Sequence, residues 1–167
     1  VFLIATPLMV YFILFAKEGV FFLSGLAYSG SIIPMQIIMP TLLFIGLTNI
    51  MGIQMLVPLG KEKIVLYSEI IGAIMDLILN FILIPKMASV GAAFGTLVAE
   101  MAVWIVQIVA LRSIVLDAYR EIHYKSILVA ILLGIIISGW VKCMSWGNFI
   151  SLFVSGILFF GIYLLAL

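Results

Sequence analysis

The fold is decided by residues 61–111, which read KEKIVLYSEIIGAIMDLILNFILIPKMASVGAAFGTLVAEMAVWIVQIVAL. This stretch contains two long apolar runs, 64–84 and 91–111, and a short connection that begins with Pro85. Each run has about the 20 residues that an α-helix needs to cross a hydrocarbon core about 30 Å thick. Proline should end the first run because it lacks a backbone N–H. The stretch therefore predicts two membrane-spanning helices joined by a tight turn.

The rest of the chain has the same apolar character. Of its 167 residues, 66% are hydrophobic and 9% are charged, whereas soluble domains average about 45–50% and about 25%. We expect an all-α integral membrane protein with about six spans, in which Pro40 kinks the second span and residues 20–33 form a loop or a short interfacial helix. The predicted spans are residues 1–16, 34–57, 64–84, 91–111, 126–141 and 149–167, with a charged loop at 112–125.

Several function classes do not fit this sequence. A net charge of +1 gives no basic surface for nucleic acid. The only histidine, His123, has no second metal ligand near it in the sequence, so we expect no metal site. Gly60-Lys61 is followed by Glu62, where a phosphate-binding loop requires Ser or Thr. We therefore expect no enzyme, no cofactor and no nucleic-acid partner.

The orientation follows from basic residues in short loops, because the cytoplasmic side retains Lys and Arg. The loops at 58–63 and 112–125 hold five basic residues, which are Lys61, Lys63, Arg112, Arg120 and Lys125. The loops on the opposite side hold three, which are Lys17, Lys86 and Lys142. This count places both loops and the C-terminus in the cytoplasm. The chain begins without methionine and has apolar runs at both ends, so we expect a part of a longer protein.

Polar residues inside the apolar runs are the candidates for function. Asp76 lies in the middle of its run, and a carboxylate at that depth costs about 2.5–3.5 kcal/mol unless it finds a partner or faces a cavity. Asp76 and Asn80 lie on one helical stripe with Glu69, Gly72 and Ala73. The candidate substrate or ion cavity residues are Asp76, Asn80, Glu100, Thr96, Gln36 and Gln54.

Two interpretations of these residues stay open. They can line a hydrated cavity, or they can form dry hydrogen bonds between helices, which typically contribute about 0.6–2 kcal/mol. Thr96, Glu100 and Gln107 share a face of the 91–111 helix, which supports a polar wall shared with the 64–84 helix. Gly91-x-x-x-Gly95 is a separate feature that favours close packing of two helix backbones.

The order of motifs in residues 1–111 resembles the C-terminal part of polysaccharide biosynthesis proteins. These are the O-antigen (Wzx-like) flippases of the multidrug/oligosaccharidyl-lipid/polysaccharide exporter superfamily. The resemblance is carried by Gly60-Lys61-Glu62-Lys63, then Asn80 and Leu83-Ile84-Pro85, then Val90-Gly91-Ala92-Ala93 with Thr96 and Glu100. Residues 126–167 match by position only, as two additional C-terminal helices.

The resemblance implies a two-lobed, MATE-like bundle of 12–14 helices, of which this chain is the C-terminal portion. Its expected function is to move undecaprenyl-pyrophosphate-linked oligosaccharide repeat units across the bacterial cytoplasmic membrane by alternating access. The expected partners are the lipid-linked oligosaccharide, the bilayer, a proton or sodium ion for coupling, and an N-terminal lobe of the same protein. One departure is that every Lys and Arg lies at a span end, so cations for the pyrophosphate would belong to that other lobe.

Two other functions remain open on the residues alone. An ion-coupled multidrug or cation extruder of the same superfamily would pair buried carboxylates with cationic substrates, which suits Asp76 and Glu100. A non-transporting subunit of a membrane complex would keep the polar stripes dry.

Overall fold

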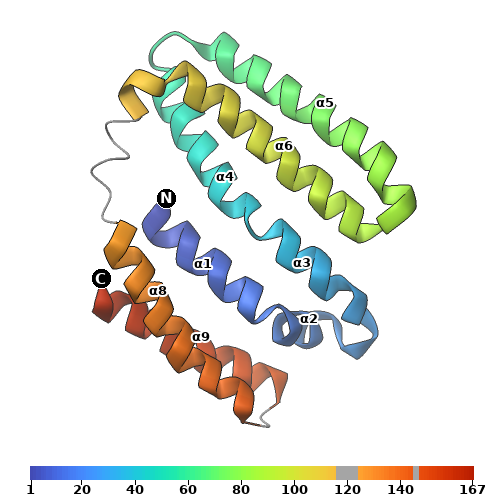
Figure 1. Ribbon diagram of the computed structural model, residues 1–167, viewed down its shortest axis with the longest axis vertical. Helices are drawn as coiled ribbons and strands as arrows, with labels where there is room; N and C mark the ends of the chain where they lie inside the picture. Colours follow the sequence, from blue (N-terminus) through green and yellow to red (C-terminus); the bar gives the residue numbers. More distant parts are fainter. Residues whose placement is uncertain (116–123, 145–146) are drawn as a thin grey trace. The chain divides into compact units, whose positions relative to one another are not determined.

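The structure is a computed structural model that describes residues 1–115, 124–144 and 147–167, and within these ranges it is helical, without a strand. Its long helices are α5 (Glu62–Met87), α6 (Ser89–Ala110), α8 (Tyr124–Gly139) and α9 (Asn148–Ala166) (Figure 1). The shorter segments are α1 (Phe2–Leu14), α2 (Ala16–Ser24), η1 (Leu26–Ser31), α3 (Ile32–Ile38), α4 (Thr41–Asn49), η2 (Ile50–Leu56) and η3 (Trp140–Cys143).

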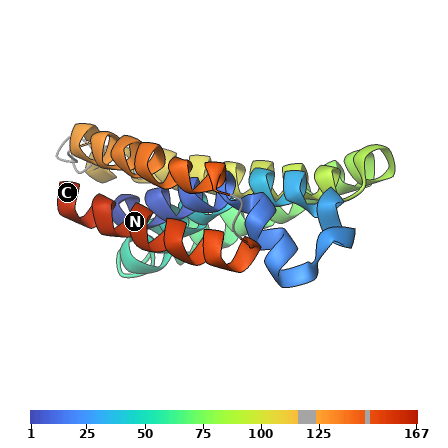
Figure 2. The same cartoon turned by 90° about the horizontal axis from the view of Figure 1, so that it is seen from below.

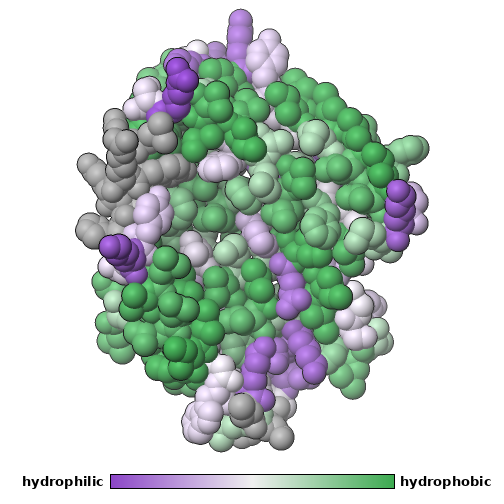
Figure 3. All heavy atoms as spheres, viewed as in Figure 1, coloured by the Kyte–Doolittle hydropathy of each residue, from purple (hydrophilic) through white to green (hydrophobic). Residues whose placement is uncertain are grey.

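The predicted fold class is confirmed. Within the described residues, four helices are long and apolar enough to cross a membrane, and there are up to six spans if each of two bent helix pairs counts as one. The face shown in Figure 3 is largely hydrophobic, and its strongly hydrophilic residues are confined to small groups. Large apolar side chains stay exposed along the long helices, for example Leu77 and Phe81 on α5. Such a surface suits contact with lipid rather than water.

The chain forms two compact units. The first unit contains Val1 and residues 37–122, and it is built from α4, η2, α5 and α6. The second unit contains residues 2–36 and 123–167, and it is built from α1, α2, η1, α8, η3 and α9, while α3 crosses the boundary. Most of the predicted charged loop at 112–125 lies outside the described residues, which stop at 115 and resume at 124.

Helices α5 and α6 form the main helix pair of the first unit and lie side by side in Figure 1. They correspond to the predicted spans 64–84 and 91–111. The prediction that Pro85 ends the first of them is wrong, because α5 continues to Met87. A proline in the last turn removes one hydrogen bond without stopping the helix, and the chain turns at Ala88, whose φ is +48°.

The predicted span 34–57 is broken at Met39 and Pro40. Helix α3 ends at Ile38 and α4 begins at Thr41, so the predicted kink at Pro40 is confirmed. From Ile50 to Leu56 the backbone is a π-helix, in which the Val57 N–H donates to the Gly52 carbonyl. A π-helix shifts the helical phase and often occurs at functional sites.

In the second unit α1 and α2 form a pair bent by 73° at Phe15. The sequence prediction ends this span at residue 16 and makes 20–33 a loop or a short interfacial helix; in the structure α2 runs from Ala16 to Ser24 and a short 3-10 helix follows. Two side chains bind carbonyl groups at the bend: Gln36 Nε2 donates to Ile13 O at 3.0 Å, and Lys142 Nζ donates to Leu14 O. The Lys142 ammonium also lies over the Phe15 ring, 4.9 Å from its centroid. Residues far apart in the sequence thus supply the hydrogen-bond donors for the backbone carbonyls at the bend.

An aromatic core holds α1 against α9, and α8 packs along α9 in the same unit (Figure 2). Tyr11, Phe15 and Phe159 are buried together, and the Tyr11 and Phe15 rings stack with centroids 5.0 Å apart. The Tyr11 hydroxyl donates to the Leu152 carbonyl at 2.6 Å and also lies 3.1 Å from Ser155 Oγ. The core is therefore fixed by a polar contact inside an apolar cluster.

We expect Tyr11→Phe to lower the free energy of unfolding by about 0.5–1.5 kcal/mol, because it removes the hydrogen bond that the buried hydroxyl donates to the Leu152 carbonyl and its contact with Ser155 Oγ. The matched control is Tyr28→Phe, since Tyr28 is exposed on η1 and should tolerate the change. Denaturant unfolding of the full-length protein in detergent measures both. Equal stability of the two variants would contradict the assigned role of the hydroxyl.

Candidate functional site

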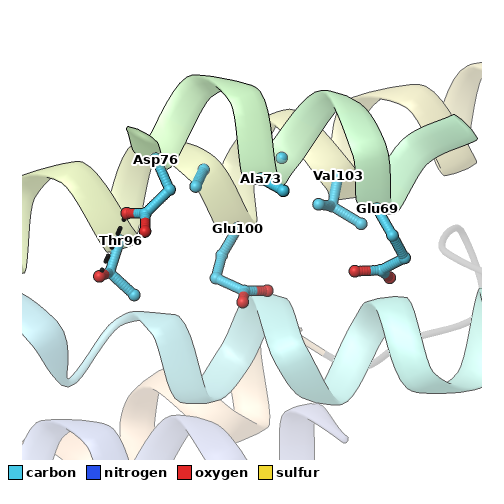
Figure 4. A pocket seen from close by; sticks show the side chains of 8 residues that line it. Glu69, Ala73, Asp76, Thr96, Glu100 and Val103 are labelled. Atoms are coloured by element: carbon cyan, nitrogen blue, oxygen red, sulfur yellow. Dashed lines mark hydrogen bonds between the residues drawn. The ribbon is translucent and has the colours of Figure 1, made fainter. Parts of the chain in front are cut away.

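A pocket of about 220 Å³ opens along the α5–α6 pair. We call it the acidic pocket, because three of its lining residues are carboxylic acids. In Figure 4 the carboxyl groups of Glu69, Asp76 and Glu100 point into the same space. The lining residues are Glu69, Gly72, Ala73, Asp76, Thr96, Ala99, Glu100 and Val103.

Small residues create this pocket. Gly72 on α5 faces α6 so closely that a β-carbon there would overlap the Val103 side chain. Ala73 and Ala99 also line the pocket and carry only a methyl group. The two helices therefore approach closely beneath the acids, as small residues allow at helix interfaces in membranes.

A cluster of polar side chains adjoins one end of the acidic pocket. Thr96 Oγ1 lies 3.5 Å from Asp76 Oδ1, the outer limit for a hydrogen bond. Asn80 packs beside Gly95, where a β-carbon would lie 2.5 Å from Asn80 Oδ1. That oxygen is buried and has no hydrogen-bond partner. Gly95 thus leaves space for the two polar side chains of α5.

A second pocket of about 290 Å³ lies where α4 and η2 meet α5 and α6. We call it the seam pocket. Glu69 and Glu100 line both pockets, so these two acids lie where the pockets adjoin. The seam pocket is lined by Ile45, Thr48, Asn49, Gly52, Ile53, Val65, Glu69, Glu100 and Gln107.

Gln107, a lining residue of the seam pocket, forms a buried polar pair with Ser68. Both side chains are fully buried, and Gln107 Nε2 donates to Ser68 Oγ at 3.1 Å. Ser68 Oγ in turn donates to the Val65 carbonyl at 2.7 Å. Gln107 Oε1 is left without a partner. A buried polar group without a partner is costly and rare in native proteins.

The electrostatic character of both pockets is negative. Among the described residues, their lining includes three carboxylic acids and neither Lys nor Arg. Like charges held close together repel in a site of low dielectric constant. The arrangement can therefore bind a proton or a cation, or accept hydrogen bonds from hydroxyl groups.

The structure brings together some of the predicted cavity residues and separates others. Asp76, Thr96 and Glu100 line the acidic pocket, and Asn80 lies beside it. Gln36 instead donates to a backbone carbonyl in the second unit. Gln54 is exposed and lines neither pocket. Gln36 precedes the break at Pro40 and belongs to the second unit, and Gln54 lies on the exposed side of η2, whereas Thr48 and Gly52 of the same predicted span line the seam pocket.

Sequence reasoning did not single out Ser68, nor did it place Gln107 among the cavity candidates. Gln107 follows Glu100 by seven residues, or two helical turns, and this spacing was the available signal. Ser68 has no such signal, because its role depends on Gln107 of the neighbouring helix. In the part of the chain that the structure describes, no group of three or more His, Cys, Asp and Glu residues could hold a metal ion. His123 lies outside that part.

Comparison with known proteins finds a similar chain in an archaeon. It is the "Uncharacterized membrane protein MJ1068" of Methanocaldococcus jannaschii, which is 27% identical over 165 residues. The match covers 99% of this chain and 32% of the relative, so the chain spans about a third of the relative's length. No family model matches the chain, and no solved structure matches it. Together with the apolar helices, the comparison identifies a multi-pass membrane protein.

Proposed function

We propose that this chain is part of a transporter and that its first unit forms one wall of a substrate cavity. The favoured function is that of a flippase, which moves undecaprenyl-pyrophosphate-linked oligosaccharide repeat units across the cytoplasmic membrane by alternating access. The proposal includes a cytoplasmic C-terminus and a second lobe that completes the cavity. It assigns no covalent chemistry to the chain.

The observation that carries the proposal is the pair of adjoining polar pockets within apolar helices. Three acids, Asn80 and Thr96 lie in or beside them, and ionisable groups at membrane depth mark substrate and ion pathways. Irregular backbone at that depth needs protein or a water-filled cavity to cover it. The π-helix supplies such backbone at the seam pocket, which its residues Gly52 and Ile53 line.

The polar groups suit a glycan that passes along a wet path. Carboxylate and amide oxygens accept hydrogen bonds from sugar hydroxyls, while the lipid tail can remain in the bilayer. Asp76 can bind a proton or a sodium ion and so couple an ion gradient to the conformational change. This role rests on its place within α5 and on its contact with Thr96.

A cation extruder of the same superfamily is the second candidate. It is favoured by the lining of the pockets, which among the described residues carries acids and no Lys or Arg. A pyrophosphate would need cations from elsewhere, whereas a cationic substrate would find its counter-charges here. Glycosyltransferase genes beside the gene for this protein would favour the flippase instead.

Complementation separates these functions. The full-length protein is expressed in a bacterium that lacks its own repeat-unit flippase, and in a second strain that lacks its cation efflux pumps. We expect surface polysaccharide to return in the first strain and resistance to organic cations to stay unchanged in the second. The reverse pattern would establish the extruder, and rescue of neither strain would contradict both transport proposals.

In the complementation strain that the wild-type protein rescues, Asp76→Asn should lower transport at least about tenfold. This factor corresponds to the loss of one interaction of a charged group. Glu62→Gln is the matched control, because Glu62 is an exposed acid at the start of the same helix and lines neither pocket. An Asp76→Asn variant that keeps wild-type transport and unchanged ion dependence would remove the coupling role of Asp76.

A further inference from the structure

Three basic residues lie at one end of the α5–α6 pair, outside both pockets. The two helices keep one antiparallel register, which is shown by the contacts Ser68–Gln107, Gly72–Val103 and Asn80–Gly95. The same register places Lys63, at the beginning of α5, level with Arg112, which follows the end of α6. Lys61 directly precedes α5, and we call Lys61, Lys63 and Arg112 the basic cluster. Figure 1 shows the beginning of α5 and the end of α6 at the same end of the first unit, and hydrophilic side chains project there in Figure 3.

The turn before α5 fixes the backbone from which both lysines project. Gly60 has a φ of +66°, in the left-handed region that favours glycine. Its N–H donates to the Val57 carbonyl at 2.9 Å, and the Lys61 N–H donates to the Leu56 carbonyl at the same distance. These two bonds form the Schellman motif that commonly ends helices. Leu56 is fully buried and anchors the turn.

Arg112 is held by a buried neighbour in the same way. Leu111 is 1% exposed, and its carbonyl accepts a hydrogen bond from the Val115 N–H at 3.0 Å. The three side chains of the basic cluster are exposed, and among the described residues none of them forms a salt bridge. Glu62, an exposed acid between the two lysines, offsets one of the three positive charges. The cluster therefore stays cationic and open to a ligand.

Exposed apolar side chains border the basic cluster. Val57 and Leu59 lie on the turn before α5, Leu66 and Tyr67 lie one turn into the helix, and Ile114 lies just beyond α6; all five are 46–59% exposed. The 26 residues of α5 span about 39 Å, which exceeds a hydrocarbon core about 30 Å thick. The charged beginning of α5 therefore reaches the headgroup layer, while its exposed apolar side chains lie in the hydrocarbon just below.

We propose that the basic cluster binds the phosphate group of an anionic membrane lipid, whose acyl chains lie along the exposed apolar side chains of α5. Phosphate oxygens accept short, charge-assisted hydrogen bonds from ammonium and guanidinium groups. Basic side chains at a membrane surface also attract anionic headgroups. A soluble anion or an acidic protein segment would match the charges and leave the apolar border unused, whereas a lipid matches both. The inference concerns a surface outside the two pockets and does not depend on the proposed transport.

A fluorophore beside the cluster reports the local lipid. Ile70 lies seven residues, or two helical turns, after Lys63 on the same face of α5 and is exposed. The full-length protein with Ile70→Cys as its only cysteine is labelled with a fluorophore and placed in vesicles of phosphatidylcholine with phosphatidylglycerol, in which either lipid carries brominated, quenching chains. Phe81→Cys, an exposed position near the other end of α5, is the control for location.

We expect the quenching at position 70 to give at least about tenfold tighter binding of phosphatidylglycerol than of phosphatidylcholine, since each basic side chain near the headgroups contributes a factor of about five. At position 81 the preference should be several-fold weaker. Inorganic phosphate, added at constant ionic strength, should not change the quenching, because it has no acyl chain. Equal binding of the two lipids at position 70 would overturn the proposal. Displacement of phosphatidylglycerol by inorganic phosphate would also overturn it, in favour of a site for free anions.

Variants in the Ile70→Cys protein assign the preference to the cluster. Lys61→Gln with Lys63→Gln should lower it at least about fivefold, whereas Lys61→Arg with Lys63→Arg should keep it. Lys17→Gln with Lys86→Gln is the matched control, because it removes the same charge from two exposed lysines elsewhere. All four lysines are exposed, so these variants should fold. Equal loss in both glutamine variants would show that net charge alone attracts the lipid and would overturn the site, while complementation judges transport separately.

Discussion

Replacing Gly91 by alanine is expected to force α5 and α6 apart and to lower the free energy of unfolding by about 1–3 kcal/mol, the usual cost of overpacking. An alanine β-carbon would lie 2.5 Å from the Leu83 carbonyl oxygen, 2.6 Å from its carbon and 3.0 Å from the Ile84 nitrogen. All three are backbone atoms of the facing helix, so no side-chain rotation can relieve the overlap. The helices themselves must move.

Gly161→Ala is the control for this substitution. Gly161 is an exposed residue in the middle of α9, and nothing lies within 4 Å of the point where its β-carbon would be. Alanine is favoured over glycine in a helix by about 1 kcal/mol, so the control should be neutral or stabilising. Unfolding of both variants in detergent gives the comparison. A Gly91→Ala protein as stable as Gly161→Ala would show that the backbones do not meet at this point.

The fold of residues 61–111 could be predicted because the information is local. Apolar length, terminal charges and Gly91-x-x-x-Gly95 together indicate two closely packed spans, and α5 and α6 follow that pattern. The error at Pro85 has a local origin too. One lost hydrogen bond did not end the helix, and the turn depended on the unusual φ of Ala88, which alanine does not signal.

The N-terminal segment could not be predicted in the same way. Lys17 and Glu18 indicate the end of a span, yet the chain bends at Phe15 and continues as a helix. The carbonyls at the bend are bound by Gln36 and Lys142, which are 23 and 128 positions away from their partners. No local pattern reveals contacts between residues so far apart in the sequence.

The part of the candidate site that lies on regular helices could be predicted from helical periodicity. Asp76, Thr96 and Glu100 lie on regular helices, and the structure places them in one pocket. Regular spacing puts Gln36 and Gln54 on one face of the predicted 34–57 span, but Gln36 lies before the break at Pro40 and binds a carbonyl of the second unit, and Gln54 is exposed on η2. The Ser68–Gln107 contact joins two helices and becomes visible only when they are packed.

The central claim is that the acids of α5 and α6 face water within the membrane, and cysteine labelling tests it most directly. In full-length protein with Cys143→Ser, single cysteines are placed at Asp76, Asn80 and Glu100 and treated in membranes with a membrane-impermeant maleimide. Leu77→Cys and Phe81→Cys are the controls, because these α5 side chains are 72% and 85% exposed and apolar, as expected for contact with lipid. We expect labelling at positions 76 and 100 from at least one side of the membrane and none at 77 and 81. No labelling at 76, 80 and 100 from either side would show that the polar stripe is dry and would contradict the transport account.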